Sequence, residues 1–213
     1  MHPLSTLFAD IAQGRLPPAD GAVDVFDSPP GPADAVLGFT AHHCIAASVD
    51  RDAVRRRLPP GDLSAPLSAE FLTWLSDALD STAGSLDLVL LAPSTVGRDL
   101  EPLEPRRDLA EHPRVVRAAR YRQDLRVYSD NTGAGVVIIG RGLAGRWELS
   151  VEVAPEARNG GLARRLVLAA RALVPPDEPL WAQVAPAHAA SMRAILAAGY
   201  RPIGAEVLLL RRV

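Results

Sequence analysis

Residues 158–164, RNGGLAR, place two adjacent glycines between arginines. An alternating apolar segment ends just before them near Val153, and a run of helix-forming residues follows, so we expect a strand, a turn and a helix in that order. The first backbone N–H groups of a helix lack intrahelical partners and lie at its positive dipole end. Glycines let a phosphate approach such N–H groups closely. The sequence therefore predicts an anion site that fits a pyrophosphate.

Two carboxylates lie on the strand that leads into this turn. In RWELSVEV (146–153), apolar residues alternate with Glu148, Ser150 and Glu152, so these three polar residues share one face. A carboxylate placed near a substrate can accept a proton from it. The alternative interpretation is that Glu148 and Glu152 pair with nearby arginines on a solvated strand face. The pattern leaves both roles open.

The composition excludes several kinds of chemistry. The 213 residues are 48% hydrophobic and 23% charged, as in a soluble globular protein of one elaborated domain or two small ones. The chain contains no lysine, which excludes Schiff-base catalysis and the Walker A lysine. Cys44 is the only cysteine, which excludes an intramolecular disulfide and fits a reducing compartment. A net charge of -2 provides no positive field for nucleic acid.

Other features also favour a soluble protein with an organic ligand. No stretch reaches the roughly 20 apolar residues of a membrane span, and the N-terminus lacks a secretion signal, so we expect a cytoplasmic location and no membrane partner. The sequence HHC (42–44) contains metal-binding residue types. Neighbouring strand residues point to opposite faces, however, and no second ligand cluster follows at the usual spacing, so we expect no metal.

The predicted elements form two halves separated by a charged, proline-rich stretch at 97–113. This division predicts an N-terminal α/β lobe over 1–105 and a second domain over 106–213. The first half contains a helix at 4–13, strands at 22–26, 35–47 (one strand or a hairpin arm) and 86–93, and helices that begin after Asp50 and Ser68. The second half contains strands at 125–130, 135–142, 146–153, 179–184, 200–204 and 206–212, with helices at 161–174 and 187–199. The order predicts an α/β fold with a mixed sheet.

RNGGLA (158–163) resembles the pyrophosphate loop of the GNAT superfamily of acyl-CoA-dependent N-acyltransferases, whose pattern is Arg/Gln-x-x-Gly-x-Gly/Ala. As in that family, the loop follows a strand end with a proline, EVAP, and precedes a long helix. Downstream, WAQVAPAHAASMRAILAAGYRPIG (181–204) is similar to the family's next strand, turn, helix and Gly-aromatic pair. The resemblance covers about residues 121–213. It implies a GNAT-like fold whose central strands splay, with the first half as an opening segment or a degenerate GNAT-like copy.

The resemblance also implies a cofactor and its binding residues. Acyl-CoA, acetyl-CoA in the simplest case, would lie between the splayed strands. Its pantetheine arm would bond to the backbone around Val151 and Val153, and His188 stands where the family usually has asparagine. Arg158 would flank the pyrophosphate, and the backbone amides that would bind it belong to Asn159, Gly160, Gly161, Leu162, Ala163 and Arg164.

The implied reaction is direct attack of a primary amine on the thioester within a ternary complex. Glu148 or Glu152 would accept the amine proton. The family's tyrosine acid is replaced by Ile195, which leaves Ser191, one helical turn earlier, as a substitute donor. The acceptor would be a small-molecule amine or a protein N-terminus, bound partly by the first half, and homodimerisation stays open.

Two other hypotheses compete with this N-acetyltransferase assignment. One is a non-catalytic acyl-CoA-binding or regulatory protein on the same fold, suggested by Ile195 and His188. The other is an unrelated α/β protein whose Gly-Gly turn only begins a helix.

Overall fold

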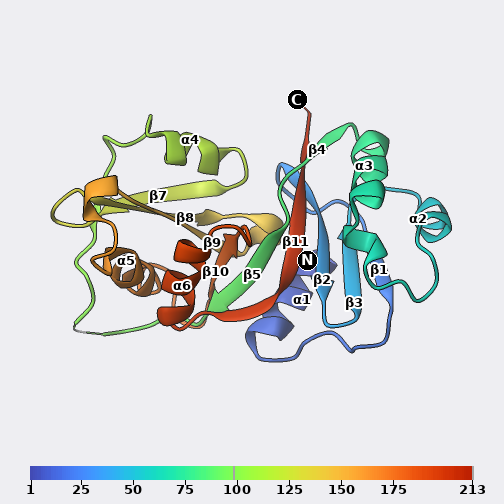
Figure 1. Cartoon of the computed structure of the whole chain (residues 1–213), viewed down its shortest axis with the longest axis horizontal. Coiled ribbons are helices and arrows are strands. Elements are labelled where there is room, and N and C mark those ends of the chain that lie inside the picture. The colour runs from blue at the N-terminus through green and yellow to red at the C-terminus, as the bar shows by residue number, and fades with distance from the viewer. Residues whose placement is uncertain (98, 213) are drawn as a thin grey trace.

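The computed structural model describes residues 1–97 and 99–212. Its strands form one mixed sheet of 11 strands, and six α-helices flank it in the described part of the chain (Figure 1). The sheet order is β1-β3-β2-β11-β5-β10-β9-β8-β7-β6, and β4 pairs with β11 away from this path. The α/β fold with a mixed sheet that the sequence predicts is confirmed.

The first half follows the sequence pattern closely. The predicted strand at 35–47 is a hairpin, and the side chains of Asp50 and Ser68 accept backbone N–H groups at the starts of the two helices that follow them. The elements are α1 (Pro3–Ala12), β1 (Val23–Phe26), β2 (Ala33–Phe39), β3 (His42–Ala46), α2 (Arg51–Arg57), α3 (Ala69–Ala78), β4 (Ser81–Ala83) and β5 (Asp87–Ala92).

The second half differs from the prediction in three places, the smallest of which is the two-residue strand β6 within the predicted linker. A helix, α4, lies where no helix is predicted, and the two predicted C-terminal strands are one bent strand, β11, with a register shift between Pro202 and Gly204. The elements are β6 (Glu104–Pro105), α4 (Pro113–Ala119), β7 (Gln123–Ser129), β8 (Gly135–Arg141), β9 (Trp147–Val153), α5 (Leu162–Ala170), β10 (Leu180–Val184), α6 (Ala189–Ala197) and β11 (Arg201–Arg211).

Strands from both halves alternate in the centre of the sheet. β5, from the first half, lies between β10 and β11 and pairs antiparallel with both. β11 in turn pairs with β2. The two halves therefore share backbone hydrogen bonds. The division at residue 105 stays a prediction.

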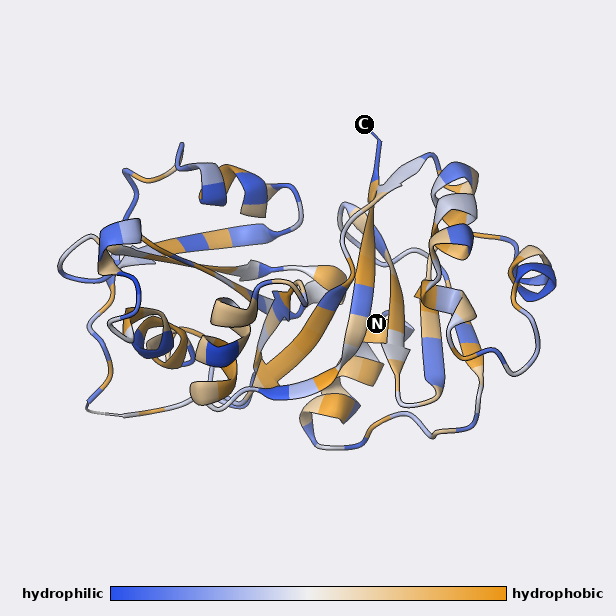
Figure 2. Ribbon diagram, in the orientation of Figure 1, coloured by the Kyte–Doolittle hydropathy of each residue, from blue (hydrophilic) through white to orange (hydrophobic). Residues whose placement is uncertain are grey.

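Apolar clusters pack against both faces of the central strands, and the ribbon of β5 is coloured mostly hydrophobic in Figure 2. On one face, residues such as Leu166 of α5 and Ile195 of α6 pack with Leu149 and Leu180. On the other face, Phe8 of α1 packs against Trp181, with 5.0 Å between ring centroids. The sheet is thus held between α5 and α6 on one side and α1 on the other.

Candidate functional site

The central strands β9 and β10 run parallel but separate after three residue pairs. Their pairing ends at Leu149 and Ala182, although β9 continues to Val153 and β10 to Val184. Beyond that point β9 stays paired with β8, and β10 stays paired with β5. The predicted splay is therefore present, and residues 150–153 of β9, which include Val151 and Val153, have no strand partner on the β10 side.

The RNGGLA loop lies directly after the free end of β9. A short turn at Pro155–Ala157 leads to Arg158, and α5 begins at Leu162. Asn159 and Gly161 adopt left-handed backbone conformations, with φ of 64° and 76°. Gly161 is the N-cap of α5 and has no side chain to cap the helix, so the first N–H groups of α5 have no side-chain acceptor there. The loop provides the backbone donors expected of an anion site.

The arginines of the loop are only partly directed at it. The Arg158 guanidinium donates to the carbonyl of Val153 at 3.2 Å and stays exposed at the loop. Arg164 instead donates to the carbonyl of Ala197 at 3.3 Å, so its side chain is directed toward α6. The Leu162 side chain is buried and only its backbone can serve a ligand, whereas Gly160 and Ala163 are at least partly exposed.

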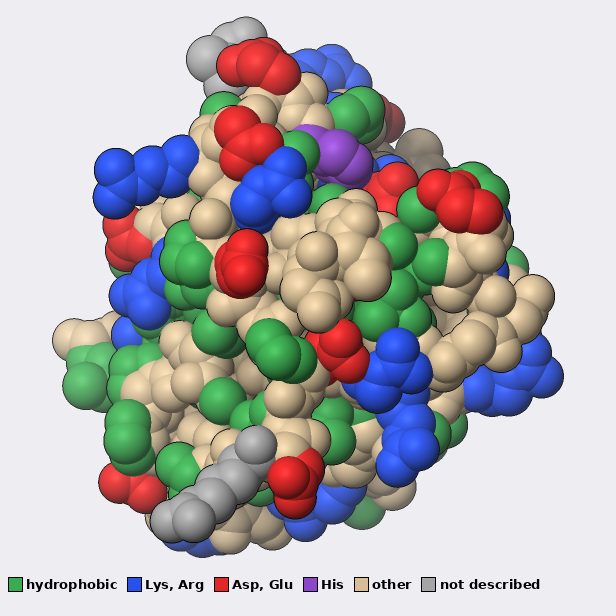
Figure 3. All heavy atoms as spheres, turned by 90° about the vertical axis from the view of Figure 1, so that its left-hand side faces the viewer, with side chains coloured by type: hydrophobic (Ala, Val, Ile, Leu, Met, Phe, Trp, Pro, Cys, Tyr) green, Lys and Arg blue, Asp and Glu red, His purple; other side chains and the backbone are tan. Residues whose placement is uncertain are grey.

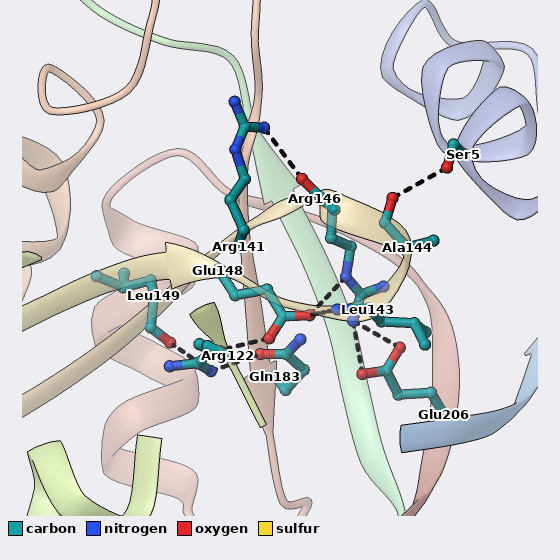
Figure 4. A network of polar contacts seen from close by, with 11 residues as sticks. Ser5, Arg122, Arg141, Leu143, Ala144, Arg146, Glu148, Leu149, Gln183 and Glu206 are labelled. Atoms are coloured by element: carbon teal, nitrogen blue, oxygen red, sulfur yellow. Dashed lines mark hydrogen bonds and ion pairs between the residues drawn. The ribbon is translucent and has the colours of Figure 1, made fainter. Parts of the chain in front are cut away.

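Glu148 lies in the interior within a chain of alternating charges (Figure 4). Its carboxylate is 1% exposed and accepts from Arg122 Nε and Arg146 Nε, both at 2.8 Å. Arg146 Nη2 also donates to both oxygens of Glu206, at 2.7 and 2.8 Å. Burial opposes ionisation of Glu148, but the two arginines outweigh it and lower its pKa below the ordinary value. Glu148 pairs with arginines as the second interpretation states, but in the core and not on a solvated face.

Arg122 joins β9 to β10 at the point where their pairing ends. Its guanidinium donates to the Leu149 carbonyl at 3.3 Å and to Gln183 Oε1 at 3.2 Å (Figure 4). It also donates to Ser150 Oγ at 2.7 Å. The side chain is 9% exposed. Sequence reasoning missed this residue, because nothing distinguishes it among 23 arginines.

Two further carboxyls lie on the polar face of the sheet. Glu152 is half-exposed, and a hydrogen bond from Arg114 Nε at 2.7 Å lowers its pKa. Asp87, at the start of β5, lies on the same face as Gln183, since Val89 pairs with Gln183 and side chains two residues apart share a face. Burial raises the pKa of Asp87 despite opposing effects from Ser85 and nearby positive groups. Sequence reasoning missed Asp87, whose only signal is an acid at the start of an apolar strand.

The predicted residues of α6 occupy different environments. His188 is its N-cap, and the imidazole is exposed and makes no capping hydrogen bond. Ser191 is exposed on the first turns of the helix, whereas Ile195 is 8% exposed and packs in the core. His188 and Ser191 thus remain accessible to a ligand, and Ile195 does not.

A pocket of about 540 Å³ lies away from the splay, at the opposite end of β9 and β10. It is lined by α1, by the turn that precedes β9 and by Trp181. The side of the molecule shown in Figure 3 carries basic and acidic side chains intermixed, without a large patch of one sign. Within the described residues, no helix is both long and apolar enough to span a membrane.

No protein-family profile and no curated protein matches the chain. Solved structures similar to it include a GNAT-family acetyltransferase from Colwellia psychrerythraea, with 13% identity, a TM-score of 0.41 and coverage of 68% of this chain and 63% of that one. A putative GNAT acetyltransferase from Novosphingobium aromaticivorans has 20% identity, a TM-score of 0.43 and coverage of 62% and 68%.

A third structure, a GCN5-related N-acetyltransferase from Kribbella flavida, has 14% identity, a TM-score of 0.41 and coverage of 68% of this chain and 65% of that one. The match spans just under two thirds of the Colwellia and Kribbella proteins.

Proposed function

We propose that the protein is an acyl-CoA-dependent N-acyltransferase that transfers an acyl group, acetyl in the simplest case, to a primary amine. The observation that carries this proposal is the end of β9–β10 pairing at Leu149 and Ala182. It leaves the backbone of residues 150–153 without a strand partner on the β10 side, where the Val153 carbonyl accepts a hydrogen bond from Arg158. A pantetheine arm contains two amides and can hydrogen-bond to such an edge as an added strand does.

The RNGGLA loop supports the same assignment. It begins five residues after Val153, so a ligand that lies along the free edge of β9 reaches the start of α5 with its other end. Backbone N–H groups around Asn159 and Gly161 are then available for a pyrophosphate, with Arg158 as an adjacent positive charge. The pantetheine arm and the pyrophosphate of CoA thus have matching partners along one path.

The proposed reaction needs one proton acceptor. The amine nitrogen attacks the thioester carbonyl carbon, the C–S bond breaks, and the amine loses a proton. Glu148 is buried and paired with two arginines, and Glu152 is paired with Arg114. Asp87 is held less tightly and its pKa is raised, so we assign it the role of general base. The departing thiolate collects its proton from water, because a thiol with pKa near 8.5 is a tolerable leaving group.

One observation favours the second candidate, a non-catalytic acyl-CoA-binding protein. Arg122 spans Ser150 and Gln183 on the polar face beside the splay. A protonated amine that approaches this face meets the Arg122 guanidinium, and the two positive charges repel each other. This candidate predicts acyl-CoA binding without acyl transfer.

Isothermal titration with acetyl-CoA tests the cofactor assignment. Gly160→Glu adds a carboxylate to the loop, and Gly160→Gln is its neutral control of the same size. Gly160 has no positive φ and an added Cβ meets only the Ala157 carbonyl at 3.8 Å, so the fold accepts both variants. We expect the Glu variant to bind at least about tenfold more weakly than the Gln variant, because a charge opposes the pyrophosphate.

The proposal is wrong if the wild-type protein does not bind millimolar acetyl-CoA, or if the two Gly160 variants bind it equally well. Once binding is established, thiol release in the presence of a panel of small amines and N-terminal peptides distinguishes the enzyme from the binding protein.

A further inference from the structure

Three side chains with metal-binding atoms come together at the edge of the sheet that is remote from β9. β1 and β3 are parallel neighbours, with Asp24 opposite Cys44. His42 lies two residues before Cys44 and therefore on the same face, whereas His43 points to the other face. A carboxylate oxygen of Asp24, a ring nitrogen of His42 and the Cys44 sulfur all lie within 4.8 Å of one another.

We propose that Asp24, His42 and Cys44 form a Zn²⁺ site. Carboxylate, imidazole and thiolate are the three ligand types that zinc prefers in proteins. His42 Nε2 lies 3.4 Å from Asp24 Oδ2. Two ligands bound at about 2.1 Å in tetrahedral geometry lie roughly 3.4 Å apart, so this pair needs little movement. Asp24 is half-exposed, which leaves solvent access for a water in the fourth position.

A second carboxylate orients the histidine. His42 Nδ1 lies 2.9 Å from Asp20 Oδ1, and the imidazole is only 6% exposed. A hydrogen bond from Nδ1–H to Asp20 fixes the tautomer in which Nε2 carries its lone pair toward Asp24. Metal-binding histidines in proteins commonly have this outer carboxylate.

The thiol proton must leave when zinc binds. Burial, with a smaller contribution from Asp24, raises the pKa of Cys44 to about 12 in the metal-free protein. The Zn–S bond replaces the S–H bond, and the proton goes to solvent. The site then connects β1, a four-residue edge strand, to β3, and its fourth position stays open to water.

HHC, whose neighbouring residues point to opposite faces, and the lack of a second ligand cluster at the usual spacing predict no metal. The third ligand is 18 residues before His42 and reaches it only through the parallel pairing of β1 with β3. Strand pairing of this kind cannot be deduced from ligand spacing.

The test uses Co²⁺, a spectroscopic stand-in for Zn²⁺, added to chelator-treated full-length protein. We expect one Co²⁺ per chain with a thiolate-to-metal charge-transfer band in the near ultraviolet, which added Zn²⁺ removes. Cys44→Ser abolishes the band. Asp24→Asn weakens Co²⁺ binding at least about tenfold, and Asp20→Asn weakens it by about 10- to 100-fold through its effect on His42. Asp27→Asn, an exposed acid-to-amide change near the end of the same strand, leaves the affinity unchanged.

Absence of the band at excess Co²⁺ overturns the proposal, and so does equal affinity of the Asp24→Asn and Asp27→Asn variants. Asp24 and Asp27 are both exposed, so circular dichroism is expected to show both variants folded. The outcome is independent of acetyl-CoA binding, because the three ligands lie on strands that do not border the splay.

Discussion

Replacement of Arg146 by methionine tests the buried chain of charges that contains Glu148 and Glu206. Arg146 is 2% exposed in its side chain and is the partner of both Glu148 and Glu206. Methionine keeps the apolar stem but leaves Glu206 as a buried carboxylate without its arginine. Removal of one member of a buried ion pair costs about 3–5 kcal/mol. For a chain of this length, that loss lowers the melting temperature by about 10 °C.

Two further variants make the prediction specific. Arg141→Met removes an ion pair to Glu178 in which the side chains are 31% and 41% exposed, so we expect a loss below about 1 kcal/mol. Adding Glu206→Leu to Arg146→Met removes the unpaired charge and leaves Glu148 balanced by Arg122. Most of the stability should then return.

The pH dependence follows from Glu206. Burial raises its pKa above the ordinary value even with Arg146 present, and loss of Arg146 raises it further. A carboxyl whose pKa is higher in the folded state stabilises the fold at low pH, and this contribution is lost as the pH rises through the folded-state pKa. The cost of Arg146→Met is therefore smaller at pH 5 than at pH 8. Urea and thermal unfolding at both pH values measure it. An Arg146→Met loss no larger than that of Arg141→Met, or no recovery with Glu206→Leu, refutes the reasoning.

Two other substitutions have defined outcomes. Asp87→Asn should lower kcat for acyl transfer by about 10²- to 10⁴-fold and remove the acidic limb of the pH–rate profile. The variant protein should be equally stable or more stable at pH 8, because burial opposes ionisation of Asp87. Unchanged turnover contradicts the assignment of Asp87 as the base. Gly204→Ala places a Cβ in steric collision with the Gly38 carbonyl oxygen and should cost about 1–3 kcal/mol in urea unfolding. In Gly97→Ala the nearest contact is an ordinary 3.5 Å, so equal stability of the two variants contradicts the close approach of β11 to β2.

Local sequence signals predict the elements that begin with a clear cap or turn. Asp50 and Ser68 cap α2 and α3, and NTGA (131–134) connects β7 to β8. These signals act within a few residues, so the residues beside each element are sufficient to predict it. α4 has seven residues, as α2 does, but its N-cap is His112 and not an Asp or Ser, and two of its residues are adjacent valines of modest helix propensity, so no local signal predicts it. Its buried face, Val115 and Ala118, is defined by the strands that it covers.

Contacts between distant residues could not be predicted in the same way. Arg122 lies 26 residues before Glu148 and 61 before Gln183, and its role follows from the separation of β9 and β10. The insertion of β5 between β10 and β11 likewise has no local sequence signal. The candidate cofactor loop was predicted from the sequence because its residues are consecutive, whereas the candidate base and the metal ligands are brought together only by strand pairing.

The arrangement of charges explains why the proposed base lies on β5. Both glutamates of β9 are bound to arginines, Glu148 to two and Glu152 to one, so neither is free to accept a proton without first losing a charged partner. Asp87 lies on the same face of the sheet and retains a raised pKa. It comes from the first half of the chain, while the RNGGLA loop comes from the second. The proposed base and the proposed cofactor loop belong to one site only because β5 is inserted beside β10, so the proposed chemistry requires both halves of the protein.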